Sequence, residues 1–84
     1  MENPSGKESE SEKIEKLTEK MEDLLKQKQE CLQKAKELMA AEDTKNGIFY
    51  HQEIFKLKQE SLRLEVESEF CRKKINRLNL GYDQ

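Results

Sequence analysis

The residues most able to do chemistry in this sequence are a cluster of basic side chains near its C-terminal end: Arg72, Lys73, Lys74 and Arg77. Four cations within six positions could bind nucleic-acid phosphates, an interaction that weakens steeply as the salt concentration rises. However, the chain carries a net charge of −2, and three acidic residues directly precede the cluster: Glu65, Glu67 and Glu69. Salt bridges along a helix and favourable placement at a helix C-terminus explain the cluster more simply. A nucleic-acid-associated accessory factor is therefore the alternative interpretation of this protein.

The other reactive residue types are too few and too scattered to form a catalytic or metal site. His51 is the only histidine, and no Glu-x-x-His pair or Cys/His cluster accompanies it. Nucleophilic catalysis requires a nucleophile, a base and an orienting group that converge in one pocket. The three glycines are dispersed, so the sequence contains no phosphate-binding loop. We expect no enzyme activity and no cofactor, metal or small-molecule ligand.

Long amphipathic helices must position all of these residues. The sequence predicts two such helices, and the second, over about 48–80, has two apolar stripes. At about 100° of rotation per residue, the main stripe contains Ile54, Leu57, Leu64, Cys71, Ile75 and Leu78. The second stripe lies roughly 175° away from the first and contains Phe55, Leu62, Val66 and Phe70. A helix with one neighbour needs only one apolar stripe. The second stripe therefore predicts a second helical neighbour.

The first helix is expected from about residue 10 to residue 42, with a capping box formed by Ser9 and Glu12. Its apolar residues alternate between spacings of three and four, which is typical of a coiled-coil seam: Ile14, Leu17, Met21, Leu24, Cys31, Ala35 and Leu38. Three further residues widen this seam on one side: Leu25, Leu32 and Met39. The opposite face is polar, so this helix is predicted to have one partner surface.

Residues 42–47 form the break between the two helices. They include no large apolar residue, and Asn46-Gly47 tolerates the left-handed backbone that often follows a helix C-terminus. Residues 1–23 hold eight acidic and four basic residues, a net charge of −4, and a turn near 43–47 would bring them close to the basic cluster. A single continuous helix is the alternative, because a straight helix would keep both main stripes aligned. We predict an all-α helical hairpin, or coiled coil, that assembles into a multi-helix bundle.

The chain divides into one helical module and two tails. Residues 1–10 are predicted to be a disordered tail, because they contain Pro4, Gly6, two serines and a single apolar residue, Met1. The module is expected to cover residues 11–82, and residues 83–84 form the second tail. Charged residues make up 40% of the chain and hydrophobic residues 33%. A lone pair of helices with this composition would bury too little apolar surface to be a stable monomer.

Several seam positions hold residues that pack less tightly than a large apolar side chain. Lys28, Ser61 and Ser68 could fix the register and the number of helices at a cost in stability. Lys28 could instead pack its aliphatic stem along the seam while its amine reaches water. Cys31 and Cys71 are interpreted as small core residues. In a hairpin centred between residues 46 and 47 they would face different partners, so a disulfide between them is not expected.

The sequence predicts a non-catalytic assembly subunit or adaptor that docks onto helical protein partners through its second stripe, Phe55, Leu62, Val66 and Phe70. A hetero-oligomer is slightly favoured over a homo-oligomer, because one stripe is aliphatic with Ser and Cys and the other is aromatic. No stretch approaches the ~18 apolar residues of a membrane span, and the N-terminus has no apolar signal core. With two separated cysteines, the protein is expected to be intracellular, in the cytoplasm or nucleus.

Overall fold

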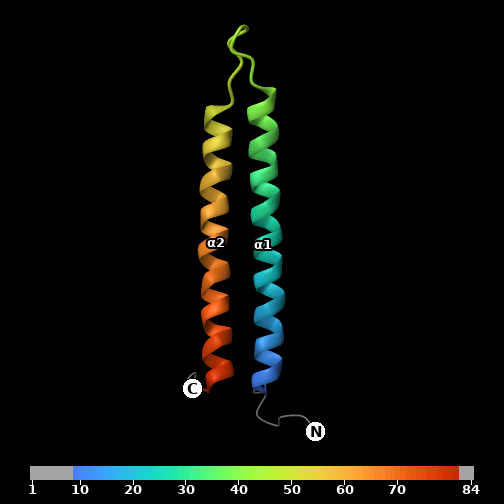
Figure 1. The fold of residues 1–84 in the computed structure, drawn as a ribbon, viewed down its shortest axis with the longest axis vertical. Coiled ribbons are helices and arrows are strands. Elements are labelled where there is room, and N and C mark those ends of the chain that lie inside the picture. Colours follow the sequence, from blue (N-terminus) through green and yellow to red (C-terminus); the bar gives the residue numbers. More distant parts are fainter. Residues whose placement is uncertain (1–8, 82–84) are drawn as a thin grey trace.

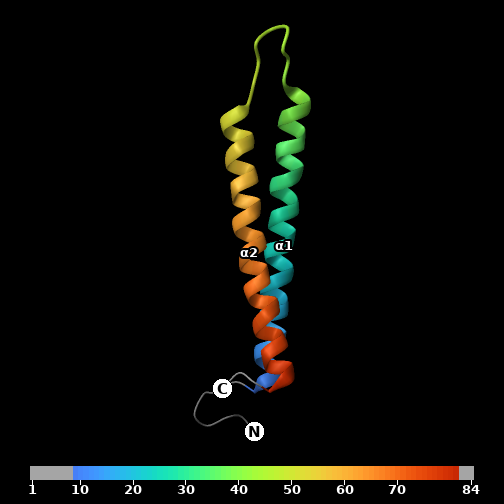
Figure 2. The ribbon, with the colours of Figure 1, turned by 60° about the vertical axis from the view of Figure 1, so that its left-hand side comes forward.

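The computed structural model describes residues 9–81 and shows two long α-helices that run antiparallel, side by side (Figures 1 and 2). Helix α1 spans Glu10–Ala41 and helix α2 spans His51–Leu80. The prediction of an all-α helical hairpin is confirmed, and the alternative of one continuous helix is wrong. Most of the tail predicted at 1–10, all of the tail at 83–84, and residue 82 of the module lie outside the described residues.

The N-terminus of α1 is closed by the predicted capping box, which the structure confirms. The Ser9 hydroxyl accepts a hydrogen bond from the backbone N–H of Glu12 at 3.2 Å, and the Glu12 carboxylate accepts one from the backbone N–H of Ser9 at 3.1 Å. These bonds satisfy two donors that a helix start would otherwise leave unpaired, a contribution of roughly 1 kcal/mol. Helix α1 therefore begins at Glu10, as the sequence predicted.

The connection between the helices is a small hairpin closed by an isolated β-bridge. Asp43 and Ile48 exchange two backbone hydrogen bonds, with N–O distances of 2.9 and 2.8 Å. The Asp43 carboxylate also accepts hydrogen bonds from the backbone N–H groups of Lys45 and Asn46, at 3.0 and 3.4 Å. Because Ile48 is held in the bridge, α2 begins at His51, three residues later than the apolar pattern suggested.

Gly47 supplies the left-handed residue of this connection, with φ of +69°. Helix α1 ends at Ala41, as the sequence predicted, with Glu42 as its C-cap in an extended conformation. Gly47 completes the turn inside the hairpin, where its N–H donates to the carbonyl oxygen of Thr44 at 3.3 Å. Glycine adopts this left-handed conformation at little steric cost, which suits it to a tight chain reversal.

The two helices bury one continuous seam between them. Leu24, Leu64 and Cys71 form the buried cluster at its centre, against which Leu17, Met21 and Cys31 pack. The seam also buries Ala35, Ile54 and Leu78. The other apolar residues expected in the seam are half-buried: Ile14, Leu38, Leu57 and Ile75. Leu64 and Ala35 are both only 1% exposed, and Leu64 is the larger of these two enclosed side chains.

Small polar residues allow the helices to approach at two seam positions. Ser61 and Ser68 are buried, and each hydroxyl donates to a backbone carbonyl one turn earlier, that of Lys58 at 2.7 Å and that of Glu65 at 2.8 Å. Because these bonds stay within α2, burial of the hydroxyls costs little and requires no partner on α1. No helix among residues 9–81 has the combination of length and apolar character needed to cross a membrane.

Candidate functional site

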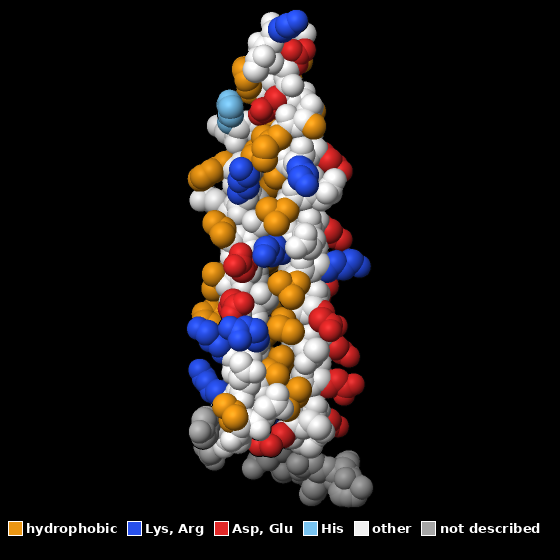
Figure 3. All heavy atoms as spheres, in the orientation of Figure 1, with side chains coloured by type: hydrophobic (Ala, Val, Ile, Leu, Met, Phe, Trp, Pro, Cys, Tyr) orange, Lys and Arg blue, Asp and Glu red, His pale blue; other side chains and the backbone are white. Residues whose placement is uncertain are grey.

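The most distinctive surface of the molecule is the outer face of α2, which we define as Phe55, Leu62, Val66 and Phe70. Their exposed fractions are 61%, 61%, 52% and 65%, respectively. Apolar side chains run along the outer edge of α2 in the space-filling view, separate from the apolar side chains at the boundary between the helices (Figure 3). Large exposed apolar patches mark interaction sites more often than isolated exposed apolar side chains do.

Helical geometry explains why α1 cannot cover this face. Residues three and four apart share one side of a helix, and the seam of α2 uses Ile54, Ser61, Leu64, Ser68 and Cys71 for its contact with α1. The outer face lies on the opposite side of the same helix. The hairpin is a single layer with principal dimensions of 66, 23 and 15 Å, so no third helix packs over it among the described residues.

A second exposed apolar row lies on α1 and was not recognised as a separate surface in the sequence. Leu25, Leu32 and Met39 were expected to widen the seam, but each is more than a third exposed. Leu32 and Met39 line a shallow groove beside the seam, together with Ala35 and with Lys58 of α2. The regular spacing of seven residues was the available signal, because each residue directly follows a seam position.

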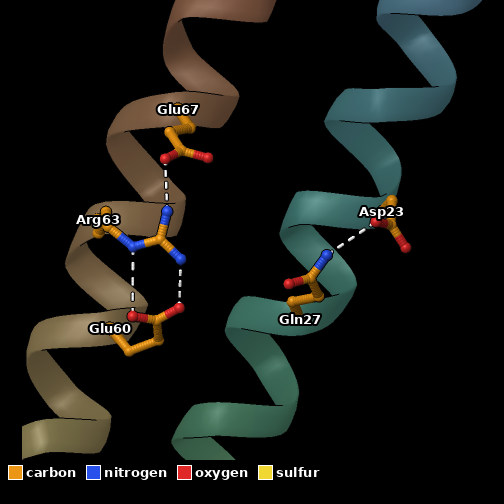
Figure 4. Close-up of polar contacts among 5 residues, drawn as sticks. All are labelled: Asp23, Gln27, Glu60, Arg63 and Glu67. Atoms are coloured by element: carbon orange, nitrogen blue, oxygen red, sulfur yellow. Dashed lines mark hydrogen bonds and ion pairs between the residues drawn. The ribbon is translucent and has the colours of Figure 1, made fainter.

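Ion pairs along α2 border its outer face. Arg63 donates hydrogen bonds to the carboxylates of Glu60, one turn before it, and Glu67, one turn after it (Figure 4). The hydrogen bond and charge of Arg63 lower the pKa of Glu60 below its ordinary value, and both carboxylates raise the pKa of Arg63. On α1, Gln27 donates to Asp23 at 2.7 Å in the same view (Figure 4). Hydrogen-bonded ion pairs therefore run along α2 beside its outer face.

The basic cluster does not form one continuous phosphate-binding strip. Arg72 donates to Glu69 at 2.9 and 2.6 Å, which lowers the pKa of Glu69 and raises that of Arg72. Lys73, Lys74 and Arg77 are exposed. Rotation of about 100° per residue spreads the four cations over more than half of the helix circumference. The hairpin also brings this end of α2 beside the acidic first half of α1 (Figures 1 and 3).

The remaining candidate residues form no reactive arrangement. His51 stacks on Phe49, with ring centroids 5.1 Å apart and an interplanar angle of 12°. Cys31 is a half-buried free thiol and Cys71 is a buried one. Among residues 9–81, no group of three or more His, Cys, Asp or Glu side chains is arranged to hold a metal ion. Nothing in this geometry assigns a catalytic role to these side chains.

Comparison with known proteins adds no further assignment. No protein-family model matches the chain, and no curated protein or solved structure matches it significantly.

Proposed function

We propose that this protein is a non-catalytic assembly subunit or adaptor that binds a helix of another polypeptide through the outer face of α2. The observation that carries the proposal is the exposure of four large apolar side chains on the side of α2 that α1 does not contact. Burial of a large apolar side chain is worth about 1.5–3 kcal/mol. A helix that covered this face would therefore gain enough free energy to offset part of the cost of association.

The shape of the outer face fits a helix rather than an extended peptide or a small molecule. It runs from Phe55 to Phe70, a length of about 22 Å along α2. The intervening Leu62 and Val66 keep the row on one side, which is the pattern of helix-in-groove recognition. The two phenylalanines at its ends are the expected anchors, because large aromatic side chains contribute most to binding energy.

The occupant is a helix of a different chain or of a second copy. The outer face is aromatic, whereas the seam face of α2 is aliphatic with Ser and Cys. Because the two faces differ, the helix on the outer face need not resemble α1, and this supports a hetero-oligomer. The difference does not disfavour pairing of two outer faces with each other. The free thiols of Cys31 and Cys71 fit a reducing compartment, the cytoplasm or nucleus.

Site-specific photo-crosslinking tests the proposal directly. A photoreactive amino acid at Leu62 is expected to form adducts of defined mass with a helical chain in cells. The matched control carries the same group at Lys26, an exposed position on the polar side of α1. Adducts from position 62 alone support docking at the outer face, whether the partner is a second copy or another protein. Equal adducts from both positions, or none from position 62, contradict it.

The nucleic-acid alternative has less support, since Arg72 is engaged by Glu69 and the other cations of the cluster point in different directions around α2. If the cluster binds DNA or RNA, the affinity should fall steeply between about 50 and 200 mM salt. Replacement of Lys73, Lys74 and Arg77 by Gln should then abolish that binding. Binding that is absent or independent of salt contradicts this alternative.

A further inference from the structure

We infer that the helix that covers the outer face of α2 is α2 of a second copy, packed antiparallel about a twofold axis beside Leu62. This inference rests on the proposed function and names the partner. The observation that carries it is the order of charged residues on both flanks of the outer face. All six charged residues from Lys56 to Glu67 form acid–base pairs of this kind, in which the two members lie equally far from the axis on opposite sides.

Three pairs show this symmetry about the midpoint between Ser61 and Leu62. They are Lys56 with Glu67, Lys58 with Glu65, and Glu60 with Arg63. In an antiparallel pair of helices related by a twofold axis, residues equally far from the axis lie at the same level. Each base of one copy therefore faces an acid of the other, and each of the three pairs occurs twice in the dimer.

The flanks are also consistent with this arrangement. An antiparallel twofold pair brings each flank of a helix against the same flank of its copy. At about 100° per residue, Lys56, Glu60, Arg63 and Glu67 lie on one flank of the outer face, whereas Lys58 and Glu65 lie on the other. Every one of the three pairs therefore joins residues on a single flank. A parallel pair would instead mix like and unlike charges, placing Lys56 beside Lys58 and Glu65 beside Glu67.

The apolar residues follow the same symmetry. Leu62 lies next to the axis and meets Leu62 of the second copy within about 1.5 Å along the helix direction. Phe55 lies within two residues, or about 3 Å, of the level of Phe70 of the second copy. The outer face thus has a phenylalanine at each end. Its apolar residues fall at nearly the same levels when the direction of the helix is reversed.

The charged groups remain accessible for these contacts in the hairpin. Glu65 pairs with Lys28 and Arg63 pairs with Glu60 and Glu67, yet all of these α2 side chains are 40–54% exposed. Lys56 and Lys58 are exposed as well. A carboxylate accepts several hydrogen bonds and a guanidinium donates five, so each group can add an intermolecular partner. The resulting assembly is a row of four helices with the two α2 helices at its centre.

Cysteine crosslinking tests the position of the axis. In the full chain with Cys31→Ala and Cys71→Ala, Leu62→Cys should form a disulfide-linked dimer under mild oxidation. At an interhelical distance of about 8–10 Å, the two Cα atoms at position 62 fall within the range that a disulfide can bridge. Val66→Cys is the matched control, because its two copies lie about 13 Å apart along the helices. Absence of the Leu62→Cys dimer, or equal crosslinking of both variants on a non-reducing gel, overturns the inference.

Sedimentation equilibrium separates failure of this inference from failure of the proposed function. The unmodified chain should form a dimer, and Phe70→Ser should weaken it at least tenfold. Leu80→Ser is the control, since Leu80 is 66% exposed on the same helix but lies beyond the overlap with α2 of the second copy. A chain that stays monomeric overturns self-pairing only, and crosslinking from position 62 then decides whether another helix binds. A dimer that Phe70→Ser leaves unchanged also overturns self-pairing through the outer face, and the proposed function is again decided by crosslinking from position 62.

A charge exchange provides an independent readout of register. Lys56→Glu and Glu67→Lys should each weaken the dimer, by about threefold to tenfold, because each pair occurs twice and exposed ion pairs are individually weak. The double variant should recover the original dimerisation constant. Additive weakening in the double variant overturns the antiparallel register about Leu62.

Discussion

Lys28 of α1 and Glu65 of α2 form an ion pair across the seam, with Nζ 3.5 Å from Oε1. The Lys28 side chain is 23% exposed, so its stem is packed against the seam and its amine reaches the surface. Both residues lie equally far from the midpoint between Asn46 and Gly47, where the sequence placed the centre of the hairpin. The ion pair therefore marks the register of the two helices.

Lys28→Leu is expected to raise the free energy of unfolding by about 1 kcal/mol. The substitution loses an exposed ion pair of small value and gains burial of apolar surface in the seam. Thermal unfolding followed by circular dichroism, at several protein concentrations, measures the effect. Glu65→Gln is the control that removes the charge facing Lys28 without adding apolar surface to the seam, and it should change stability by less. A destabilised Lys28→Leu variant would show that the Lys28 amine contributes more to stability than apolar burial at this position does.

Leu64→Ala is expected to lower the free energy of unfolding by about 2–5 kcal/mol. Leu64 is 1% exposed, so truncation of its side chain leaves a cavity between the helices. Leu80→Ala removes the same atoms from a side chain that is 66% exposed, and should change stability by no more than about 0.5 kcal/mol. Urea unfolding of both variants measures the difference. Similar costs for the two variants would be incompatible with the seam described above.

Gly47→Ala is expected to destabilise the hairpin by about 1–2 kcal/mol. Gly47 has φ of +69°, which is costly for a residue with a Cβ. No atom lies within 4 Å of the position that an added Cβ would occupy, so the cost arises from the backbone and not from a clash. Gly47→Asn should cost less, since Asn adopts this conformation more readily. Equal unfolding free energies for all three chains would contradict this explanation.

The pKa of Glu69 is lowered by its hydrogen bond from Arg72, and NMR titration of the side-chain carboxyl should detect this. A carboxylate whose folded pKa is depressed contributes stability that is present above its ordinary pKa of 4.5. That contribution is lost as the pH falls through the folded pKa. Arg72→Gln should return the midpoint of Glu69 towards its ordinary value.

Glu60 is the control in the same spectrum, because its pKa is lowered by Arg63 and not by Arg72. Its midpoint should not move in the Arg72→Gln variant. Both carboxylates are exposed, so added salt should reduce the two shifts. Movement of Glu60 and Glu69 together would mean that a long-range field, and not the local hydrogen bonds, lowers their pKa values.

Much of this architecture is encoded locally in the sequence. The capping box of Ser9 and Glu12 acts within one helical turn, and the helices follow from apolar residues repeated at spacings of three and four. The outer face of α2 was also visible in the sequence, because helical rotation alone separates Phe55 and Phe70 from Leu64. These features depend on residues a few positions apart, which is why they could be predicted before the fold was known.

Other features were decided only when α1 packed against α2. The bridge between Asp43 and Ile48 delays the start of α2, although the apolar pattern would allow the helix to begin earlier. Leu25 and Leu32 remain exposed because the line along which the helices meet determines which flank of a wide apolar stripe is covered. A rotation of α1 by a few tens of degrees would bury them. Sequence periodicity defines the stripe, and the position of the second helix determines which part of it stays free to bind a partner.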